Sequence, residues 1–463
     1  MKFKLPDTLI LLLIILAAFT LLTWIIPAGE FDRQIVDERE LVTPGSYHET
    51  ESNPAGFFDF ILAPIKGFIS SAQIIVFIFF VAGSFGIINK TGAIEAGLQS
   101  VVRLSRQRPK SKKFVIPVLM MLFSLAGATF GMSEEVLVFI LITLPLSFAL
   151  GYDSIVGVSI PFIGAGAGFA GAFLNPFTIG IAQGIAELPP FSGWEYRLVV
   201  WALFTITAIV FVLIYANRIE KTPSASPMHE IDKKSRYKDH EGVEATFNLK
   251  HKAVVSIFLS GLVLLIVGVN QWDWYINEIS GLFLILGAIS ALVYRMPVSD
   301  AVEAFVQGAA EMIKVTFVIA IAKGILIVAS EGMIIDTILQ ALSTAVKDYP
   351  KAVSVELMFY MQSFLNFFLP SGSGQAALTM PIMAPLSDIL GISRQTAVLA
   401  FQLGDGLSNI IIPTSGVTMG VLTIANIPYQ KWFKWVLPLM IIFFLLAMLV
   451  LLPPVLFFDW SGM

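Results

Sequence analysis

Apolar runs dominate the sequence, and their lengths constrain the fold more than any other feature. A transmembrane helix needs about 20 mainly apolar residues. Nine runs are close to that length or longer: Leu9–Ile26, Ala72–Ile88, Ser154–Ile185, Leu198–Ala216, Val254–Val269, Ile279–Val293, Val315–Ala329, Ala397–Ile424 and Val436–Leu452. Charged residues make up 13% of the chain, whereas soluble proteins carry about 25%. The sequence therefore predicts an all-α polytopic membrane protein with about nine transmembrane helices.

Basic residues predict the orientation, because loops rich in Lys and Arg stay on the cytoplasmic side. The loop 103–113 holds six Lys or Arg and no acid, and the loop 218–252 holds eight. The stretch Gly29–Ala55 holds seven acids and two Arg, which places it outside. Nine crossings then put the N-terminus in the cytoplasm and the C-terminus outside. Two amphipathic stretches, Phe57–Ser70 and Val298–Ile313, are expected at the membrane surface.

Two further apolar stretches, Phe114–Leu150 and Val353–Leu390, are too long for one crossing and are split near the middle by small polar residues. Each arm has roughly 15 residues, or about 22 Å of helix, which is short for a crossing. Non-helical backbone inside a bilayer persists only where it is buried in protein or lines a wet cavity. We therefore predict two re-entrant helical hairpins with tips inside the membrane. The alternative is that Phe114–Leu150 forms two short crossings, with Glu134 and Glu135 in an exposed loop.

The two split stretches belong to an internal repeat with an offset of 240 residues. Between 133–166 and 373–406, 10 of 34 positions are identical, including Pro145-Leu146-Ser147 on Pro385-Leu386-Ser387. The charged loops make the two halves inverted, an arrangement found in many secondary transporters. The predicted layout has four parts: 1–216, the first inverted repeat with its hairpin at 114–150; 217–252, a flexible cytoplasmic linker; 253–270, a connecting transmembrane helix; and 271–463, the second inverted repeat with its hairpin at 353–390.

The helix after each hairpin is interrupted by proline. The first contains Asn175-Pro176 and the second Pro413-Thr414. Proline removes a backbone donor and frees a carbonyl one turn earlier. Freed carbonyls beside side-chain oxygens suit Na⁺, and a helix that begins after each tip directs its free N–H groups at the cavity, which suits an anionic group. The expected Na⁺ ligands are Asn175, Ser408, Asn409 and Thr414.

Three carboxylates lie at these interruptions, namely Glu134, Glu135 and Asp405. Carboxylates within a membrane are costly and usually functional. Lys323 is the one cation we identify at that depth, and it is a candidate counter-ion. Because acids outnumber bases, the cavity favours a cationic substrate, bound protons or Na⁺. The alternatives are a structural role for Asp405 and a Lys323 that reaches the membrane surface.

These features define a candidate site where the hairpin tips and the interrupted helices meet. The predicted substrate-binding residues are Ser133, Glu134, Glu135, Asn175, Ser373, Gly374, Gln375, Asp405, Asn409 and Thr414. The predicted groups for a coupling cation or proton are Glu135, Asp405, Ser408 and Asn175. Glu135 and Asp405 are expected to hold a substrate amine, a guanidinium or the coupling cation, and the N–H groups of the tips a carboxylate.

Several motifs resemble those of the DcuC family, in particular its YfcC-type members, within an ion-transporter superfamily that has paired hairpins. The sharpest stretches are 130–135 (FGMSEE), 150–154 (LGYDS), 175–177 (NPF), 371–381 (SGSGQAALTMP), 401–406 (FQLGDG) and 413–415 (PTS). The resemblance implies a dimeric inner-membrane carrier whose site is formed by the hairpin tips and broken helices. The family's name indicates C4-dicarboxylates, whereas YfcC-type members are assigned to basic amino acids, including arginine–ornithine exchange.

The leading prediction is a secondary active transporter of a small organic solute that works by alternating access. A basic amino acid is favoured because no Arg stands in the motifs to clamp a dicarboxylate; a Na⁺- or H⁺-coupled carrier of C4-dicarboxylates is the alternative. A passive channel would need a continuous wet path, and no nucleophile, ATP-binding or cofactor motif indicates an enzyme. Na⁺ or H⁺ is the expected coupling ion. The expected partners are the substrate, the bilayer and a second copy of the chain, and a net charge of −4 predicts no nucleic-acid binding.

Overall fold

The computed structural model describes residues 8–36, 39–43, 45–94, 96–97, 100, 109–189, 191–233, 247–272, 274, 276–346, 349–458 and 460. Four stretches used above to predict orientation or the linker, 1–7, 101–108, 234–246 and 461–463, lie outside them. The first half contains α1 (Thr8–Ile25), α2 (Phe57–Ser70), α3 (Ala72–Lys90), α5 (Pro109–Phe130), α6 (Val136–Ala149), α7 (Ser154–Ala170), the π-helical turn η1 (Pro176–Gly180), α8 (Ile181–Ile185) and α9 (Trp194–Lys221). The remainder contains the 3₁₀ turn η2 (Pro223–Ala225), α10 (His229–Asp232), α11 (Leu249–Gln271), α12 (Ile276–Tyr294), α13 (Val298–Ala310), α14 (Ile313–Glu331), α15 (Ile334–Val346), α16 (Lys351–Phe368), α17 (Gly372–Leu390), α18 (Arg394–Ser408), α19 (Gly416–Ile424), α20 (Tyr429–Leu451) and α21 (Pro453–Leu456).

Five helical segments of the described chain are long and apolar enough to cross a membrane: Ala72–Lys90, Trp194–Lys221, Ile276–Tyr294, Val298–Glu331 and Tyr429–Leu456. Large apolar side chains such as Ile214, Ile285 and Leu445 are exposed on these helices, where lipid would cover them. The prediction of a mostly helical chain with apolar membrane helices is confirmed. The count of nine crossings stays a prediction.

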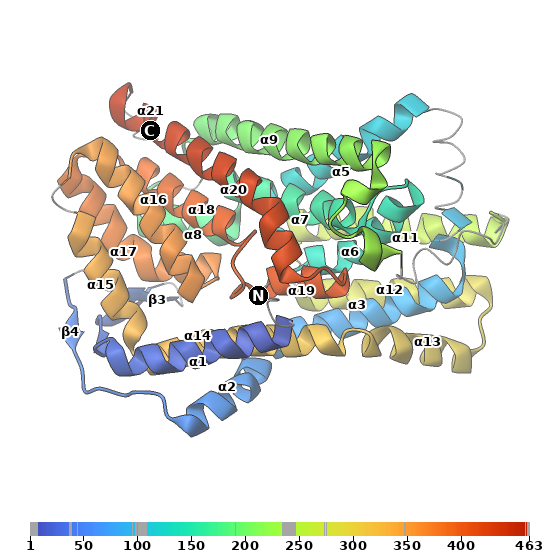
Figure 1. Cartoon of the computed structure of the whole chain (residues 1–463), viewed down its shortest axis with the longest axis horizontal. Helices are drawn as coiled ribbons and strands as arrows, with labels where there is room; N and C mark the ends of the chain where they lie inside the picture. Colours follow the sequence, from blue (N-terminus) through green and yellow to red (C-terminus); the bar gives the residue numbers. More distant parts are fainter. Residues whose placement is uncertain are drawn as a thin grey trace.

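Surface helices from the two halves exchange partners reciprocally. α2 packs along α14 and α13 packs along α3, while α1 also contacts α14 and α12 contacts α3. Figure 1 shows these six helices along one long side of the molecule. The α2–α14 and α13–α3 contacts both depend on glycine. A Cβ on Gly67 would lie 2.0 Å from the Ala320 carbonyl oxygen, and a Cβ on Gly308 would lie 2.4 Å from that of Ala82. Each half therefore supplies an amphipathic helix that packs tightly on a long helix of the other half.

Each split stretch folds as two helices joined by a short turn. Residues 131–135 join α5 to α6, and residues 369–371 join α16 to α17. The arms contain 22, 14, 18 and 19 residues, so three of them are longer than the expected 15, because the helices extend to the tip or into the flanking polar residues. The helices that follow break near the prolines, between α7 and η1 and between α18 and α19. Since α7 and α18 contact each other, the two helix breaks approach one another inside the molecule.

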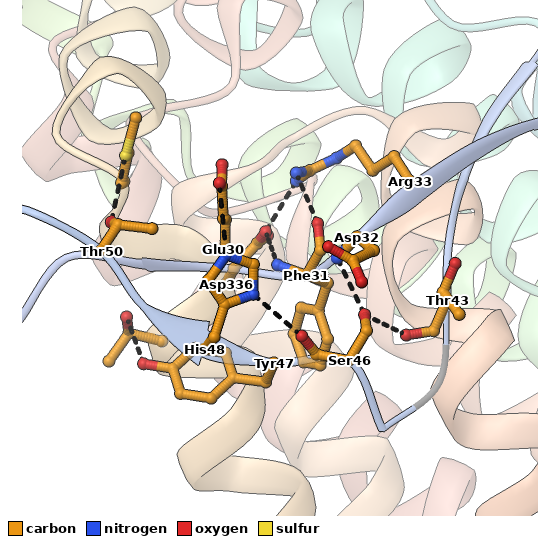
Figure 2. A network of polar contacts seen from close by, with 12 residues as sticks. Glu30, Phe31, Asp32, Arg33, Thr43, Ser46, Tyr47, His48, Thr50 and Asp336 are labelled. Atoms are coloured by element: carbon orange, nitrogen blue, oxygen red, sulfur yellow. Dashed lines mark hydrogen bonds and ion pairs between the residues drawn. The ribbon is translucent and has the colours of Figure 1, made fainter.

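The stretch predicted to lie outside forms two small antiparallel sheets docked on the second half. Its strands are β1 (Gly29–Glu30) paired with β4 (His48–Glu49), and β2 (Arg33–Val36) paired with β3 (Arg39–Val42). Figure 2 shows the anchor, in which Asp336 of α15 accepts hydrogen bonds from the Phe31 backbone N–H (3.0 Å) and the Arg33 guanidinium (2.7 Å). Because β3 also contacts α17, this segment lies against the second hairpin.

The predicted linker 217–252 is partly folded, which differs from the expectation of a flexible segment. α9 continues to Lys221, and η2 and α10 follow it. Asp232 of α10 accepts a hydrogen bond from the Ser154 backbone N–H (2.9 Å), and Met228 is fully buried. The segment docks because a carboxylate satisfies a free N–H group at the start of α7, a long-range contact that polar composition does not reveal.

Candidate functional site

A cavity of about 340 Å³ lies where the two hairpin turns, the two helix breaks and α14 meet. Six of the predicted site residues line it: Ser133, Glu134, Glu135, Ser373, Asn409 and Thr414. Other polar lining residues are Ser71, Thr178, Lys323, Ser371 and Ser415. Both halves of the chain therefore contribute to one cavity.

The first hairpin turn presents two carboxylates. Gly131 adopts φ +71°, and a Cβ there would lie 2.6 Å from the Asn175 side-chain oxygen, so the turn closes tightly on the first helix break. Glu135 is 8% exposed and accepts a hydrogen bond from the Ser133 backbone N–H (3.0 Å). α6 begins at the next residue. Glu134 and Glu135 therefore lie at a helix N-terminus, where the helix dipole stabilises negative charge.

The second hairpin turn presents hydroxyl and backbone N–H groups instead. Ser371 caps α17 by accepting from the Gly374 N–H (3.3 Å), and Ser415 caps α19 by accepting from the Thr418 N–H (3.4 Å). The N-termini of α6, α17 and α19 thus open onto the cavity, and their free N–H groups favour an anionic group. Lys323 of α14 also lines the cavity, where it and Glu134 attract each other.

Five predicted site residues do not line the cavity: Asn175, Gly374, Gln375, Asp405 and Ser408. Most of them have structural hydrogen bonds. The Asn175 side-chain oxygen accepts from the Phe177 N–H (2.9 Å) and caps η1. The Gln375 amide donates to the carbonyl and side-chain oxygens of Gln362 (2.9 and 2.8 Å), which ties the two arms of the second hairpin together. Asp405 is fully buried behind the cavity wall.

The structure does not bring together the four expected Na⁺ ligands. Asn409 and Thr414 line the cavity. Ser408 is buried, where its hydroxyl donates to the Gly404 carbonyl (2.5 Å), and the oxygen of Asn175 is occupied as a cap. The pattern located the helix breaks, but it did not show which side chains of each break point into the cavity.

Thr178, Ser71 and Ser371 are cavity residues that the sequence reasoning missed. A signal was present for Thr178, which falls on Thr418 under the 240-residue shift. Ser371 begins the SGSG stretch, in which the sequence pattern predicts Ser373 and Gly374 as site residues. Ser71 lies between α2 and α3, where no motif marks it.

Comparison with known proteins places the chain in a transporter family. The family model described as C4-dicarboxylate anaerobic carrier, DcuC, matches residues 5–455. The chain is 35% identical to the Escherichia coli (strain K12) protein named "Putative basic amino acid antiporter YfcC", with 97% of this chain and 96% of the relative covered. It is 32% identical to an uncharacterized protein of Haemophilus influenzae, with 87% and 79% covered.

Two solved transporter structures are similar over most of the chain. Neisseria gonorrhoeae MtrF, from a class of antimetabolite efflux pumps, has a TM-score of 0.41 at 17% identity and covers 97% of this chain and 95% of its own. The Alcanivorax borkumensis YdaH transporter has a TM-score of 0.43 at 16% identity and covers 98% and 100%. These scores are too low to establish a common fold, so the classification rests on the family model and the two relatives. The chain therefore belongs to the DcuC family and is an integral membrane protein of the transporter class.

Proposed function

We propose that this protein is a secondary active transporter that exchanges a basic amino acid across the inner membrane by alternating access. The observation that carries the proposal is the charge of the cavity, which is lined by Glu134 and Glu135 against Lys323. With all three ionised, the lining carries one net negative charge. A basic amino acid carries one net positive charge at neutral pH, because its α-ammonium and α-carboxylate cancel and its side chain is cationic. Substrate and cavity are therefore neutral together.

The cavity also offers separate places for the two ends of such a substrate. Glu134 and Glu135 accept charge-assisted hydrogen bonds from the ammonium or guanidinium groups, which are among the stronger polar contacts in proteins. The N-termini of α17 and α19, together with Lys323, hold the α-carboxylate. The printed name of the E. coli relative supports the same class of substrate.

Alternating access is supported by the reciprocal packing of the two halves, which is the arrangement expected of inverted repeats. α14 ends at Glu331, which pairs with Lys66 of α2 (2.7 Å), next to the stretch predicted to lie outside. α3 ends at Lys90, which pairs with Glu303 near the middle of α13 (3.3 Å). In the proposed orientation α14 runs outward and α3 inward, with the N-terminus in the cytoplasm and the C-terminus outside.

The orientation is directly testable, because the sequence contains no cysteine and single cysteines can be introduced on a clean background. Ser52 and Ser299 are both exposed, and the proposal places them outside and inside, respectively. We expect a membrane-impermeant maleimide to label Ser52→Cys in intact cells and Ser299→Cys only after permeabilisation. Labelling of both variants in intact cells would refute the orientation.

The transport activity is tested in proteoliposomes by exchanging external labelled arginine against internal ornithine. Glu135→Gln should weaken exchange by about 10- to 100-fold, because a hydrogen bond to a charged group contributes about 1.5–3 kcal/mol. Glu195→Gln, on the exposed first turn of α9, is the matched control and should retain full activity. Internal substrate should accelerate uptake. Uptake without such acceleration would indicate a channel, and full exchange by Glu135→Gln would refute the assigned site.

Carriage of C4-dicarboxylates is the alternative that the family model favours, and Lys323 with the three helix N-termini would serve two carboxylates. A thermal-shift comparison of arginine, ornithine, succinate and fumarate separates the two. A ligand at 100 times its Kd stabilises the native state by about 2.7 kcal/mol. We expect stabilisation by arginine and ornithine. Stabilisation by succinate and fumarate alone would replace the proposed substrate class.

A further inference from the structure

A buried carboxylate that the proposed substrate does not contact lies directly behind the cavity wall. Asp405 on α18 has no exposed surface. One of its carboxylate oxygens is 3.3 Å from the Asn409 amide nitrogen, and the other has no hydrogen-bond partner among the described residues. A charged carboxylate without a partner inside a membrane protein costs several kcal/mol. The Asp405 carboxylate therefore needs a positively charged partner.

Two buried side-chain oxygens on elements packed against α18 also lack hydrogen-bond partners among the described residues. Asn366 of α16 has no exposed surface, and its amide nitrogen donates to the Asp405 carbonyl (3.0 Å), which leaves its side-chain oxygen unpartnered. The hydroxyl of Thr178 is also buried, and it has no hydrogen-bond partner in the part of the chain that the structure describes. A Cβ on Gly372 would lie 3.0 Å from the free Asp405 oxygen and 2.5 Å from the Thr178 methyl group, so both side chains border this glycine. A proton on Asp405 would satisfy one oxygen, whereas a metal cation would be shared by several.

No described element packed on α18 brings a basic group to Asp405; the buried Arg197 of α9 contacts α18 at its first turn, where it donates to the Gln395 side-chain oxygen (3.1 Å). α7, η1 and α8 contain no charged residue. The charged residues of α16, α17, α18 and α20 lie toward helix ends: Lys351, Glu356, Asp388, Arg394, Lys431 and Lys434. Glu134, Glu135 and Lys323 lie at the cavity itself. No described side chain therefore neutralises Asp405, which leaves a proton or a bound metal cation to do so.

The first half of the chain has no equivalent of the polar residues that surround Asp405. Under the 240-residue shift Asn366, Asp405 and Ser408 fall on Ala126, Ala165 and Gly168. Gln362 and Gln402 fall on Leu122 and Phe162 in the same way. This set of polar residues therefore occurs only in the second half, although each of its helices has a repeat-related counterpart in the first half.

We propose that Asp405, Asn366 and Thr178 form a closed site for a single Na⁺, which each protomer binds together with its substrate. The site rests on the proposed transport function, and its carboxylate, Asp405, lies behind the wall of the substrate cavity. Thr178 and Gly372 also line the cavity, so the ion reaches the site through it. Na⁺ supplies the charge that Asp405 lacks and accepts the neutral oxygens of Asn366 and Thr178 as ligands. One site per chain predicts one Na⁺ per substrate.

The test is a Na⁺ titration of the thermal stability of the purified full chain without substrate, with choline keeping the ionic strength constant. We expect stabilisation by Na⁺ with a Hill coefficient of one in the wild type and in Glu135→Gln, and none in Asp405→Asn. Thr178→Val removes one ligand oxygen and should raise the Kd for Na⁺ by about tenfold. Thr143→Val is the matched control, because the Thr143 hydroxyl is buried and bonds the Phe139 carbonyl of its own helix (3.0 Å).

Each result separates this inference from the transport proposal. A wild type that responds to pH but not to Na⁺, a Hill coefficient of two, or an unchanged response in Asp405→Asn would overturn the Na⁺ site, whatever the exchange assay shows. If Asp405→Asn does not fold, an unchanged Kd in Thr178→Val overturns the site as well. Arginine should still stabilise Asp405→Asn with a Kd within about threefold of wild type, because Asp405 does not line the cavity. Absence of exchange in the wild type, with Na⁺ binding intact, would refute the transport function alone.

Discussion

Substitution of the two crossing glycines should destabilise the protein by similar amounts. A Cβ at residue 67 would stand 2.0 Å from the Ala320 carbonyl oxygen, and one at residue 308 would stand 2.4 Å from that of Ala82. Overpacking costs about 1–3 kcal/mol, and a backbone obstacle cannot rotate away, so we take about 3 kcal/mol. Alanine regains about 1 kcal/mol over glycine in a helix. Gly67→Ala and Gly308→Ala should therefore each cost about 2 kcal/mol.

Thermal unfolding in detergent measures this difference. An unfolding entropy of about 2.1 cal/mol/K per residue amounts to about 1 kcal/mol/K for the chain, so each variant should lower Tm by about 2 °C. Gly281→Ala on α12 is the control, because a Cβ there has nothing within 4 Å, and its Tm should stay or rise. If both Gly67→Ala and Gly308→Ala behave like the control, the crossings are looser than the structure shows. If only one of them is destabilised, the two halves do not pack reciprocally.

Three further predictions concern the surroundings of the cavity. Trp432 has no exposed surface, so Trp432→Ala should cost about 3–5 kcal/mol and lower Tm; an unchanged Tm would contradict its packed position beside the second helix break. Asp336→Ala removes the acceptor of Arg33 and should cost about 2 kcal/mol of docking, seen as roughly thirtyfold faster proteolysis of residues 29–50; unchanged cleavage would rule out this anchor. The pKa of His48 is raised from 6.5, chiefly by its hydrogen bond to the Ser46 carbonyl and further by Asp32 and Glu30. Its protonated form therefore stabilises the folded segment 29–50 below pH 6.5, and this stabilisation is lost as the pH rises through the raised pKa. Cleavage should therefore accelerate between about pH 5 and pH 8 in the wild type but not in His48→Gln, and an identical profile in both would refute the assignment.

Much of the fold could be predicted because its signals are local. Apolar runs located α3 and α14, and Pro176 and Pro413 located the two helix breaks. The docking of the linker could not be predicted, because it depends on one hydrogen bond between Asp232 and the backbone of Ser154, 78 residues away. Nothing in the polar composition of 217–252 distinguishes a carboxylate that caps a distant helix from one that is solvated.

The site was only partly predictable, because a sequence pattern places a residue on a helix without giving the direction of its side chain. Asp405 and Asn409 are one turn apart, yet only Asn409 lines the cavity. The repeat does not settle the matter either. Ala165, which matches Asp405, is also buried but lines the cavity, so matching positions of the two halves do not stand in the same place relative to the cavity.

The proposed mechanism gives a physical reason for this difference between matching positions. A carrier built from inverted repeats opens to one side at a time, so in any single state its two halves differ in conformation although their sequences match. The 240-residue offset relates the sequences of the two halves and does not indicate which half is closed. In this structure the second half buries its carboxylate at Asp405, while the first half turns the equivalent helix surface toward the cavity. Because Thr178 and Gly372 line the cavity, an ion bound at Asp405 would leave through this cavity when the exchange of the two conformations opens it.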